Sequence, residues 1–172
     1  MDYSNILIET NRLKIRPIGL KHINEIFEEF TSEICKYLIP QPSKNINDIR
    51  DFINISMCQL KNGITIQFEL ENKKDEFIGI VGVYKIDTRE PELGLWIKKK
   101  EQNIGYGTEA LNAIIEWINQ NLEYDHIIYP IDKRNEKSRK LIEKLNGKIA
   151  NVRKNKNSNE IEFEEVEYRI SK

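Results

Sequence analysis

A glycine-rich segment, residues 102–107 with the sequence Gln-Asn-Ile-Gly-Tyr-Gly, carries the residue types and spacing that most clearly indicate chemistry. It follows an extended apolar segment, residues 93–99, and precedes a helical pattern that begins near Thr108. Gly105 and Gly107 allow the backbone to approach a ligand closely, and the N–H groups in the first turn of a helix have no partners within the helix. The helix dipole adds partial positive charge at the same point. The segment therefore predicts a binding site for a phosphate-bearing ligand.

Two well-known phosphate-binding loops fit this segment poorly. A nucleoside triphosphate loop ends in Gly-Lys-Ser/Thr, and no such Lys pair follows these glycines. The dinucleotide pattern Gly-x-Gly-x-x-Gly/Ala is met by Gly105, Gly107 and Ala110, and Asp132 would be placed to bind a ribose. That fold, however, puts its first glycine directly after the strand, whereas residues 100–104 intervene here. It also needs several further strand–helix units, and only one helix is expected downstream.

A third pattern, Gln/Arg-x-x-Gly-x-Gly/Ala, is filled at all its fixed positions by Gln102, Gly105 and Gly107. Four other segments resemble parts of the same protein family, in family order and at family spacing: residues 10–17 (TNRLKIRP), 77–82 (FIGIVG), 91–97 (PELGLWI) and 135–138 (NEKS). Together they make the chain similar to the GNAT superfamily of N-acetyltransferases over about residues 8–150. The first of these segments looks like the RimJ/RimL-like branch, the ribosomal-protein N-terminal acetyltransferases.

The resemblance implies a fold, a donor and a set of site residues. The fold is a single α/β domain, residues 1–172, with a mixed, mostly antiparallel twisted sheet and helices on both faces. Acetyl-CoA is the implied acetyl donor, and a primary amine, either a protein N-terminus or a small molecule, is the implied acceptor. Glu92 and Ser138 are the implied catalytic residues. The residues implied for cofactor binding are Leu95, Trp96, Ile97, Gln102, Asn103, Ile104, Gly105, Tyr106, Gly107, Thr108, Asn135 and Ser138.

The expected reaction places a specific demand on a general base. A lysine-like amine with a pKa of ~10.4 is only about 1 part in 2,500 neutral at pH 7, a cost of roughly 4.6 kcal/mol. An N-terminal amine with a pKa of ~8 costs only about 1.4 kcal/mol. Glu92, at the head of the strand that leads into the glycine loop, is the candidate base, directly or through a water molecule. The alternative is an exposed glutamate at a strand edge with no chemical role. Backbone N–H groups of residues 95–97, where two strands separate in this family, are implied to polarise the carbonyl group.

Asn135 and Ser138 lie one helical turn apart, at the start of the last expected helix. Asn135 suits pantetheine binding by resemblance and helix capping on local grounds. Ser138 is the candidate to protonate or orient the leaving thiolate, and the alternative is a hydroxyl on a helix face. The sequence departs from many relatives at Ile142, near which a tyrosine general acid commonly stands. Isoleucine cannot donate a proton, so an acyl-CoA sensor without turnover stays open as a second hypothesis.

Composition excludes several other classes of protein. A length of 172 residues suits one domain, and a net charge of −1 offers no broad basic surface for nucleic acid. Cys35 and Cys58 fit a reduced, cytoplasmic protein without disulfides, and neither has a neighbouring ligand that would indicate a metal site. No signal peptide is recognised and no apolar run approaches 18 residues, so no membrane association is expected. A homodimer is left open.

Hydrophobic periodicity gives the expected order of elements. Strands are expected at residues 13–18, 64–70, 77–86, 92–98 and 127–131, and residues 148–171 are expected to form a final hairpin. Helical spacing is present at residues 23–30, 49–60, 108–122 and 138–145. The acceptor would be selected by the two N-terminal helices, the loop at residues 38–42 and the final hairpin. Trp96 and Tyr84 are expected to belong to the core of the sheet.

Overall fold

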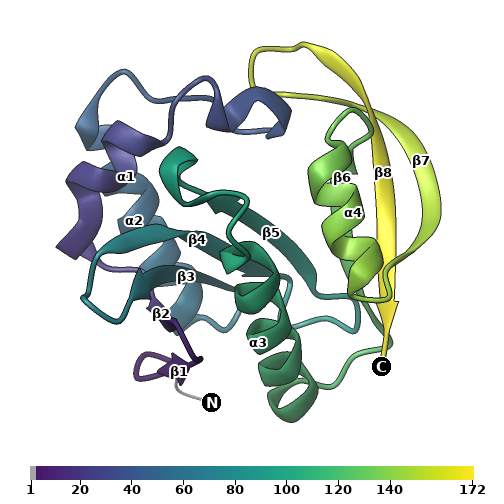
Figure 1. The fold of residues 1–172 in the computed structure, drawn as a ribbon, viewed down its shortest axis with the longest axis horizontal. Helices are drawn as coiled ribbons and strands as arrows, with labels where there is room; N and C mark the ends of the chain where they lie inside the picture. The colour runs from purple at the N-terminus through teal and green to yellow at the C-terminus, as the bar shows by residue number, and fades with distance from the viewer. Residues whose placement is uncertain (1–2) are drawn as a thin grey trace.

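The computed structural model describes residues 3–172, which form one eight-stranded sheet with four α-helices (Figure 1). The strands occur along the sheet in the order β1-β2-β3-β4-β5-β6-β8-β7. Their bounds are β1 Ile8–Glu9, β2 Leu13–Pro17, β3 Thr65–Asn72, β4 Phe77–Tyr84, β5 Glu92–Ile97, β6 His126–Asp132, β7 Lys148–Lys156 and β8 Glu162–Ser171. The helices are α1 Ile23–Glu29, α2 Ile46–Lys61, α3 Tyr106–Asn121 and α4 Glu136–Lys144. All neighbouring strands are antiparallel except β5 and β6.

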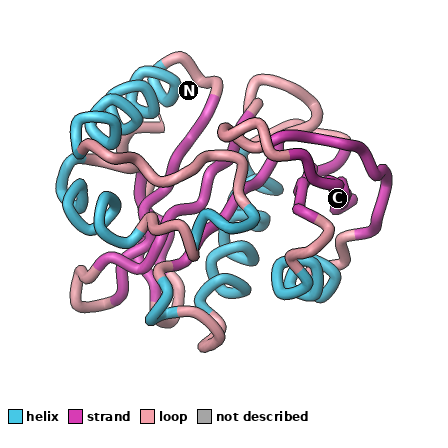
Figure 2. Tube along the Cα trace, turned by 90° about the horizontal axis from the view of Figure 1, so that it is seen from above, coloured by secondary structure: helices cyan, strands magenta, loops and turns pink. Residues whose placement is uncertain are grey.

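The two faces of the sheet are covered by different helices. In β3, Ile66, Phe68 and Leu70 face α3 and α4 and belong to the larger apolar cluster, which also contains Leu111 and Ile142 of these helices. The intervening residues of β3 face α1 and α2, where a smaller cluster includes Ile26, Ile49, Ile53, Phe77 and Ile80. Figure 2 shows helices on both sides of the strands. The alternation follows from the period of two residues in a strand.

The predicted fold class is confirmed, with differences at the edges of elements. The short strand β1 and three 3-10 turns, at residues 20–22, 34–37 and 99–101, were not predicted. They are too short to show a periodic pattern, so the sequence gives no signal for them. Helix α3 begins at Tyr106, two residues before the predicted start, because Gly105 takes a left-handed conformation and ends the loop there. Among residues 3–172, no helix combines the length and the apolarity needed to cross a membrane.

A buried polar cluster lies where the 3-10 turn at residues 20–22 packs against β2 and β3. The Glu71 carboxylate accepts from His22 Nε2 at 2.7 Å and from Lys21 Nζ, and Arg16 Nε lies 3.3 Å from it. His22, Glu69 and Glu71 offer ligand atoms within 4.8 Å of one another, but two cations, Lys21 and Arg16, already neutralise this group. Burial raises the pKa of Glu69 to about 7. Burial also acts on Glu71, but hydrogen bonds from Lys21 and His22 outweigh it and hold the pKa of Glu71 below its ordinary value.

These opposite shifts predict how the free energy of unfolding depends on pH through the protonation of Glu69. The folded state keeps a proton on Glu69 that the unfolded chain loses between pH 4.5 and about 7, so the free energy of unfolding falls as pH rises through this window. Glu71, with its lowered pKa, acts only below pH 4.5. Glutamine resembles the protonated acid, so Glu69→Gln will stabilise the protein at pH 8 by on the order of 2 kcal/mol more than at pH 5.

Urea unfolding of the wild type and of Glu69→Gln at pH 5 and pH 8 measures this difference. The exposed Glu162 of β8, changed to glutamine, is the matched control and will show no such pH dependence. Parallel stability curves for the wild type and Glu69→Gln across the window would contradict the assignment.

Candidate active site

The glycine-rich loop ends in a helix N-terminus whose N–H groups are unpaired. Asn103 and Gly105 have φ of 64° and 95°, so the chain turns sharply before α3. The N-terminus of α2 is capped by the Asn45 side chain and that of α4 by Asn135, whereas no side chain caps α3. Within the described chain, the N–H groups of residues 103–108 have no acceptor, and the first intrahelical bond runs from Glu109 N–H to Gly105 C=O at 3.1 Å. This arrangement suits an anion.

Packing against β5 and α4 fixes the position of this loop. The Gln102 side chain donates to the C=O of Ile97 at 2.9 Å, which ties the start of the loop to the end of β5. A Cβ atom on Gly107 would lie 3.1 Å from Leu141 Cδ1 and 3.2 Å from Leu95 Cδ2. Gln102 therefore positions the loop, and Gly107 allows the close approach of three elements. Both were predicted from the loop pattern as cofactor-binding residues, without these packing roles.

Arg12, in the turn between β1 and β2, forms a network with the loop that sequence reasoning missed. Its guanidinium group donates to Ile104 C=O at 2.9 Å, lies 4.5 Å from the centre of the Tyr106 ring and pairs with Glu109 at 2.6 Å. Thr10 Oγ1 also donates to Glu109, at 2.6 Å. Burial acts on Glu109, but these hydrogen bonds outweigh it and hold its pKa below the ordinary value. The carboxylate in the first turn of α3 is thus neutralised by Arg12. Arg12 was part of a quoted motif, but its type alone does not reveal a partner so distant in sequence.

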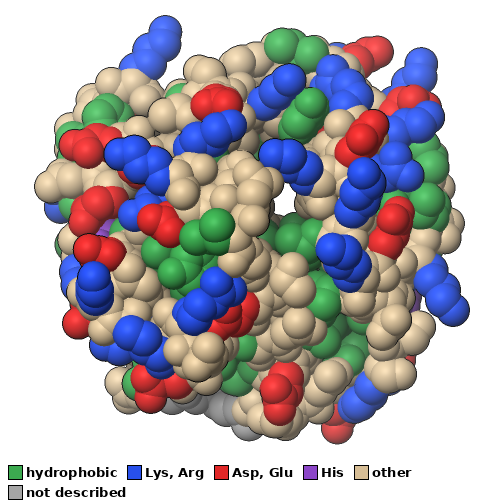
Figure 3. Space-filling model, in the orientation of Figure 1, with side chains coloured by type: hydrophobic (Ala, Val, Ile, Leu, Met, Phe, Trp, Pro, Cys, Tyr) green, Lys and Arg blue, Asp and Glu red, His purple; other side chains and the backbone are tan. Residues whose placement is uncertain are grey.

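The sheet opens between β5 and β6. These strands share one registered pair, Glu92 with Ile128, whereas β5 pairs with β4 along its whole length. Lys98 N–H donates to Ile78 C=O at 2.9 Å, so the antiparallel alternation turns the Trp96 N–H towards β4 and the N–H groups of Leu95 and Ile97 towards the gap. Figure 3 shows an opening through the molecule between β5 and α4, with Lys and Arg side chains around it. Of the three predicted backbone donors, Leu95 and Ile97 face this opening.

At the N-terminus of α4, Asn135 and Ser138 lie together. The Asn135 side chain accepts from Ser138 N–H at 3.2 Å, so the capping role is present. Ser138 Oγ lies 3.5 Å from the hydroxyl oxygen of Tyr129, a buried residue of β6. Burial raises the pKa of Tyr129, and its hydrogen bond with Ser138 only partly offsets this. Tyr129 was not predicted, because a tyrosine within an apolar strand pattern reads as core. Ile142 is fully buried in the larger apolar cluster.

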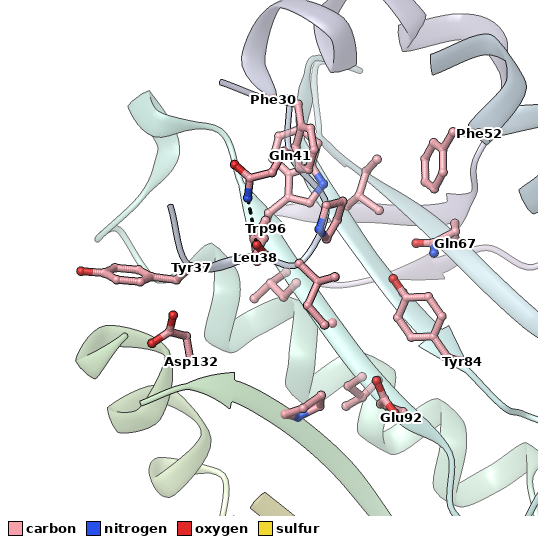
Figure 4. Close-up of a pocket in the computed structure, with 18 of the residues that line it drawn as sticks. Phe30, Tyr37, Leu38, Gln41, Phe52, Gln67, Tyr84, Glu92, Trp96 and Asp132 are labelled. Carbon is pink, nitrogen blue, oxygen red and sulfur yellow. Dashed lines mark hydrogen bonds between the residues drawn. The ribbon is translucent and has the colours of Figure 1, made fainter. Parts of the chain in front are cut away.

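On the opposite face of the opening, β5 borders a cavity of about 430 Å³ (Figure 4). Its walls come from α1, α2, the 37–43 segment, β3 to β6 and β8. Aromatic and aliphatic side chains predominate, and the aromatic ones are Phe30, Tyr37, Phe52, Tyr84, Trp96 and Phe163. The segments expected to select the acceptor therefore meet in one cavity. Trp96 packs against the smaller apolar cluster, as expected of a core residue, and against Phe30 at 5.1 Å between ring centres, and it also lines the cavity.

Glu92 and Tyr84 lie opposite each other on β5 and β4, at one end of the cavity. Glu92 is half-buried, and one carboxylate oxygen lies 3.0 Å from Lys85 Nζ. The Tyr84 ring covers the glycine pair Gly82 and Gly94, where a Cβ atom on Gly82 would lie 2.7 Å from the ring. Burial raises the pKa of the Tyr84 hydroxyl, and the charge of Glu92 raises it further. Tyr84 was expected in the core, but the two glycines make it a wall of the cavity.

Comparisons with known proteins agree with this architecture. A family model described as an acetyltransferase (GNAT) domain matches residues 12–148, which is most of the chain. An uncharacterized N-acetyltransferase, p20 of Bacillus licheniformis, is 25% identical over 140 residues, 79% of each chain. RimL, a ribosomal L7/L12 α-N-protein acetyltransferase solved with coenzyme A, has a TM-score of 0.87 at 13% identity, over 96% of this chain and 98% of that chain. MccE, a microcin C7 self-immunity acetyltransferase solved with acetyl-CoA and AMP, has a TM-score of 0.85 at 19% identity, over 95% of this chain and 94% of that chain.

The family match covers both parts of the site, because residues 12–148 include β5, the loop before α3, β6 and the N-terminus of α4. The chain belongs to the GNAT acetyltransferase family and uses acetyl-CoA as its acetyl donor.

Proposed function

We propose that this protein transfers an acetyl group from acetyl-CoA directly to the primary amine of an acceptor held in the cavity beside β5, and that it does so in the cytoplasm. The observation that carries the proposal is the opening between β5 and β6. It joins a helix N-terminus with free N–H groups on one side to a cavity containing Glu92 on the other. The acetyl donor supplies an activated thioester, so no covalent enzyme intermediate is required.

The donor side of the site would be built mainly from backbone. The N–H groups of residues 103–108 are free to bind the pyrophosphate, and the dipole of α3 adds to their attraction. Arg12 prevents Glu109 from repelling these phosphates, since it neutralises that carboxylate. Asn135 accepts the Ser138 N–H with its side-chain oxygen, which leaves its amide NH₂ to hydrogen-bond the pantetheine arm.

The reaction needs three kinds of assistance from the chain. The N–H groups of Leu95 and Ile97 would stabilise the oxygen of the thioester carbonyl as the amine nitrogen bonds to its carbon. Glu92 would take the proton that the amine loses, directly or through a water molecule. When the carbon–sulfur bond breaks, Ser138 would give its proton to the thiolate. The proton that Glu92 takes from the amine would pass to solvent and replace the one that Ser138 gives up, and Tyr129, whose hydroxyl oxygen accepts from Ser138 Oγ at 3.5 Å, would position the Ser138 hydroxyl.

A second candidate is a sensor that binds acyl-CoA without turnover. The burial of Ile142 in the apolar core favours it, because no tyrosine stands on α4 to act as the acid. The Ser138–Tyr129 pair supports the enzyme instead, since it offers a hydroxyl at the same helix N-terminus. Formation of any acetylated amine at a rate that depends on Ser138 decides between the two.

Changing Thr108 to aspartate tests the pyrophosphate site. Thr108 lies in the first turn of α3, where a negative charge stabilises a helix by about 0.3–1 kcal/mol. Thr108→Asp will therefore keep or raise the melting temperature while repelling the pyrophosphate, and we expect coenzyme A to bind at least tenfold more weakly. Thr108→Asn, similar in shape but neutral, is the control. Isothermal titration that finds equal affinities for the two variants would show that the pyrophosphate lies elsewhere.

Changing Glu92 to glutamine tests the general base. General-base assistance contributes ~10²–10⁴ in rate, so kcat for an alkyl amine will fall by about that factor at pH 7. The loss will shrink as pH rises, because the amine then loses its proton unaided. Acetyl-CoA affinity will stay unchanged. Glu90→Gln, two residues earlier and exposed, is the control. A loss of equal size at every pH would assign Glu92 a structural role only.

A further inference from the structure

We propose that the acceptor is a primary amine attached to an apolar, ring-sized group and carrying no carboxylate or phosphate beside the amine. The inference rests on the proposed function and narrows its acceptor class. An N-terminal aromatic residue of a peptide and a simple arylalkylamine share this chemistry, and the experiment below separates them.

The apolar lining of the cavity is the first argument. Phe52 and Tyr84 leave 36% of their surface exposed and Ile39 leaves 44%, because they border the cavity. These side chains come from α2, β4 and the 37–43 segment, so apolar surface faces the cavity from several directions. A volume of about 430 Å³ falls within the range of 300–1,000 Å³ typical of small-molecule sites. An aromatic group on the acceptor would cover this surface and remove it from water.

The charges of the lining are the second argument. Four carboxylates border the cavity, on Asp48, Glu92, Asp132 and Glu165, whereas no Lys, Arg or His among residues 3–172 does. Three of them have basic partners that do not line the cavity: Glu92 with Lys85 at 3.0 Å, Asp132 with Arg134 at 2.6 Å and Glu165 with Arg153 at 2.6 Å. The lining accepts an ammonium group. A carboxylate or phosphate on the acceptor would meet no cation and would lie close to these acids.

The same pairs argue against a polyamine. A second and third ammonium group would each need an unpaired carboxylate, because burying a charge without a partner is costly. Asp132 and Glu165 are buried and each is bound to an arginine, whereas Glu92 is half-buried and its lysine partner, Lys85, is exposed and free to turn into solvent when an ammonium group replaces it. Asp48 is the remaining lining acid, and it is exposed in the first turn of α2. The cavity therefore favours a single positive charge.

The test compares kcat/KM for defined amines at saturating acetyl-CoA. We expect phenylalaninamide to exceed alaninamide, free phenylalanine and spermidine by at least tenfold each. The comparison with alaninamide measures the contribution of the apolar group, and the comparison with free phenylalanine measures the penalty for a carboxylate. The comparison with spermidine measures the preference for a single positive charge. A higher value for a short peptide that starts with phenylalanine than for phenethylamine assigns the peptide source, and the reverse order assigns the small amine.

A variant of the cavity wall makes the test specific. Phe52→Ala removes a ring from the wall and will cut the ratio of phenylalaninamide to alaninamide at least threefold, through a higher KM for phenylalaninamide. Ile55→Ala, on the same helix, 56% exposed and outside the lining, will leave that ratio unchanged.

Three results would overturn the proposal: equal use of free phenylalanine, a preference for alaninamide or spermidine, or an unaltered ratio in Phe52→Ala. The failure of the proposed function looks different, because acetyl-CoA would then bind while no amine in the set is acetylated.

Discussion

The separation of β5 from β6 is the constraint on which the rest of this structure depends. After the single pair between Glu92 and Ile128, the two strands diverge, and the free edge of β5 keeps the N–H groups of Leu95 and Ile97 unpaired by the sheet. Buried backbone donors without partners are costly, so a fold that retains them is suited to a ligand that supplies acceptors. The same divergence lets α3 and α4 bring their N-termini to one face while the cavity proposed for the acceptor forms on the other.

The two faces of the site favour ligands of opposite charge. On one face of β5, the uncapped α3 N-terminus suits anions, and Arg12 neutralises the carboxylate of Glu109 in its first turn. On the other face, four carboxylates line the cavity, and the basic partners of three of them are not part of that lining. In the proposed function, an anionic donor and a cationic acceptor would thereby be directed to different sides of β5. The arrangement uses short-range contacts, in keeping with a net charge of only −1.

The sequence predicted the elements that have strong periodicity and the loop that has a distinctive pattern. The strands from β2 to β6, the four α-helices and the terminal hairpin lie close to their expected places, whereas the two-residue strand β1 was missed. Individual roles were harder to predict, since they depend on contacts between distant residues. Arg12 reaches Glu109 across 97 positions, and Tyr84 lines the cavity because Gly82 and Gly94 pair beneath its ring. Neither contact produces a local sequence pattern that could be recognised. Tyr129 likewise resembles any residue of an apolar strand, and its contact with Ser138 becomes apparent only in the structure.

Hydrogen exchange of individual backbone amides tests the central claim most directly. In the free protein, the Trp96 amide should exchange slowly because it is bonded to β4, while the Leu95 and Ile97 amides should exchange quickly through the opening. Addition of acetyl-CoA should slow exchange at Leu95 or Ile97 and leave Trp96 unchanged. Slow exchange at both residues in the free protein, or no change on adding acetyl-CoA, would contradict the account of β5 as the open edge at which the acetyl group is held.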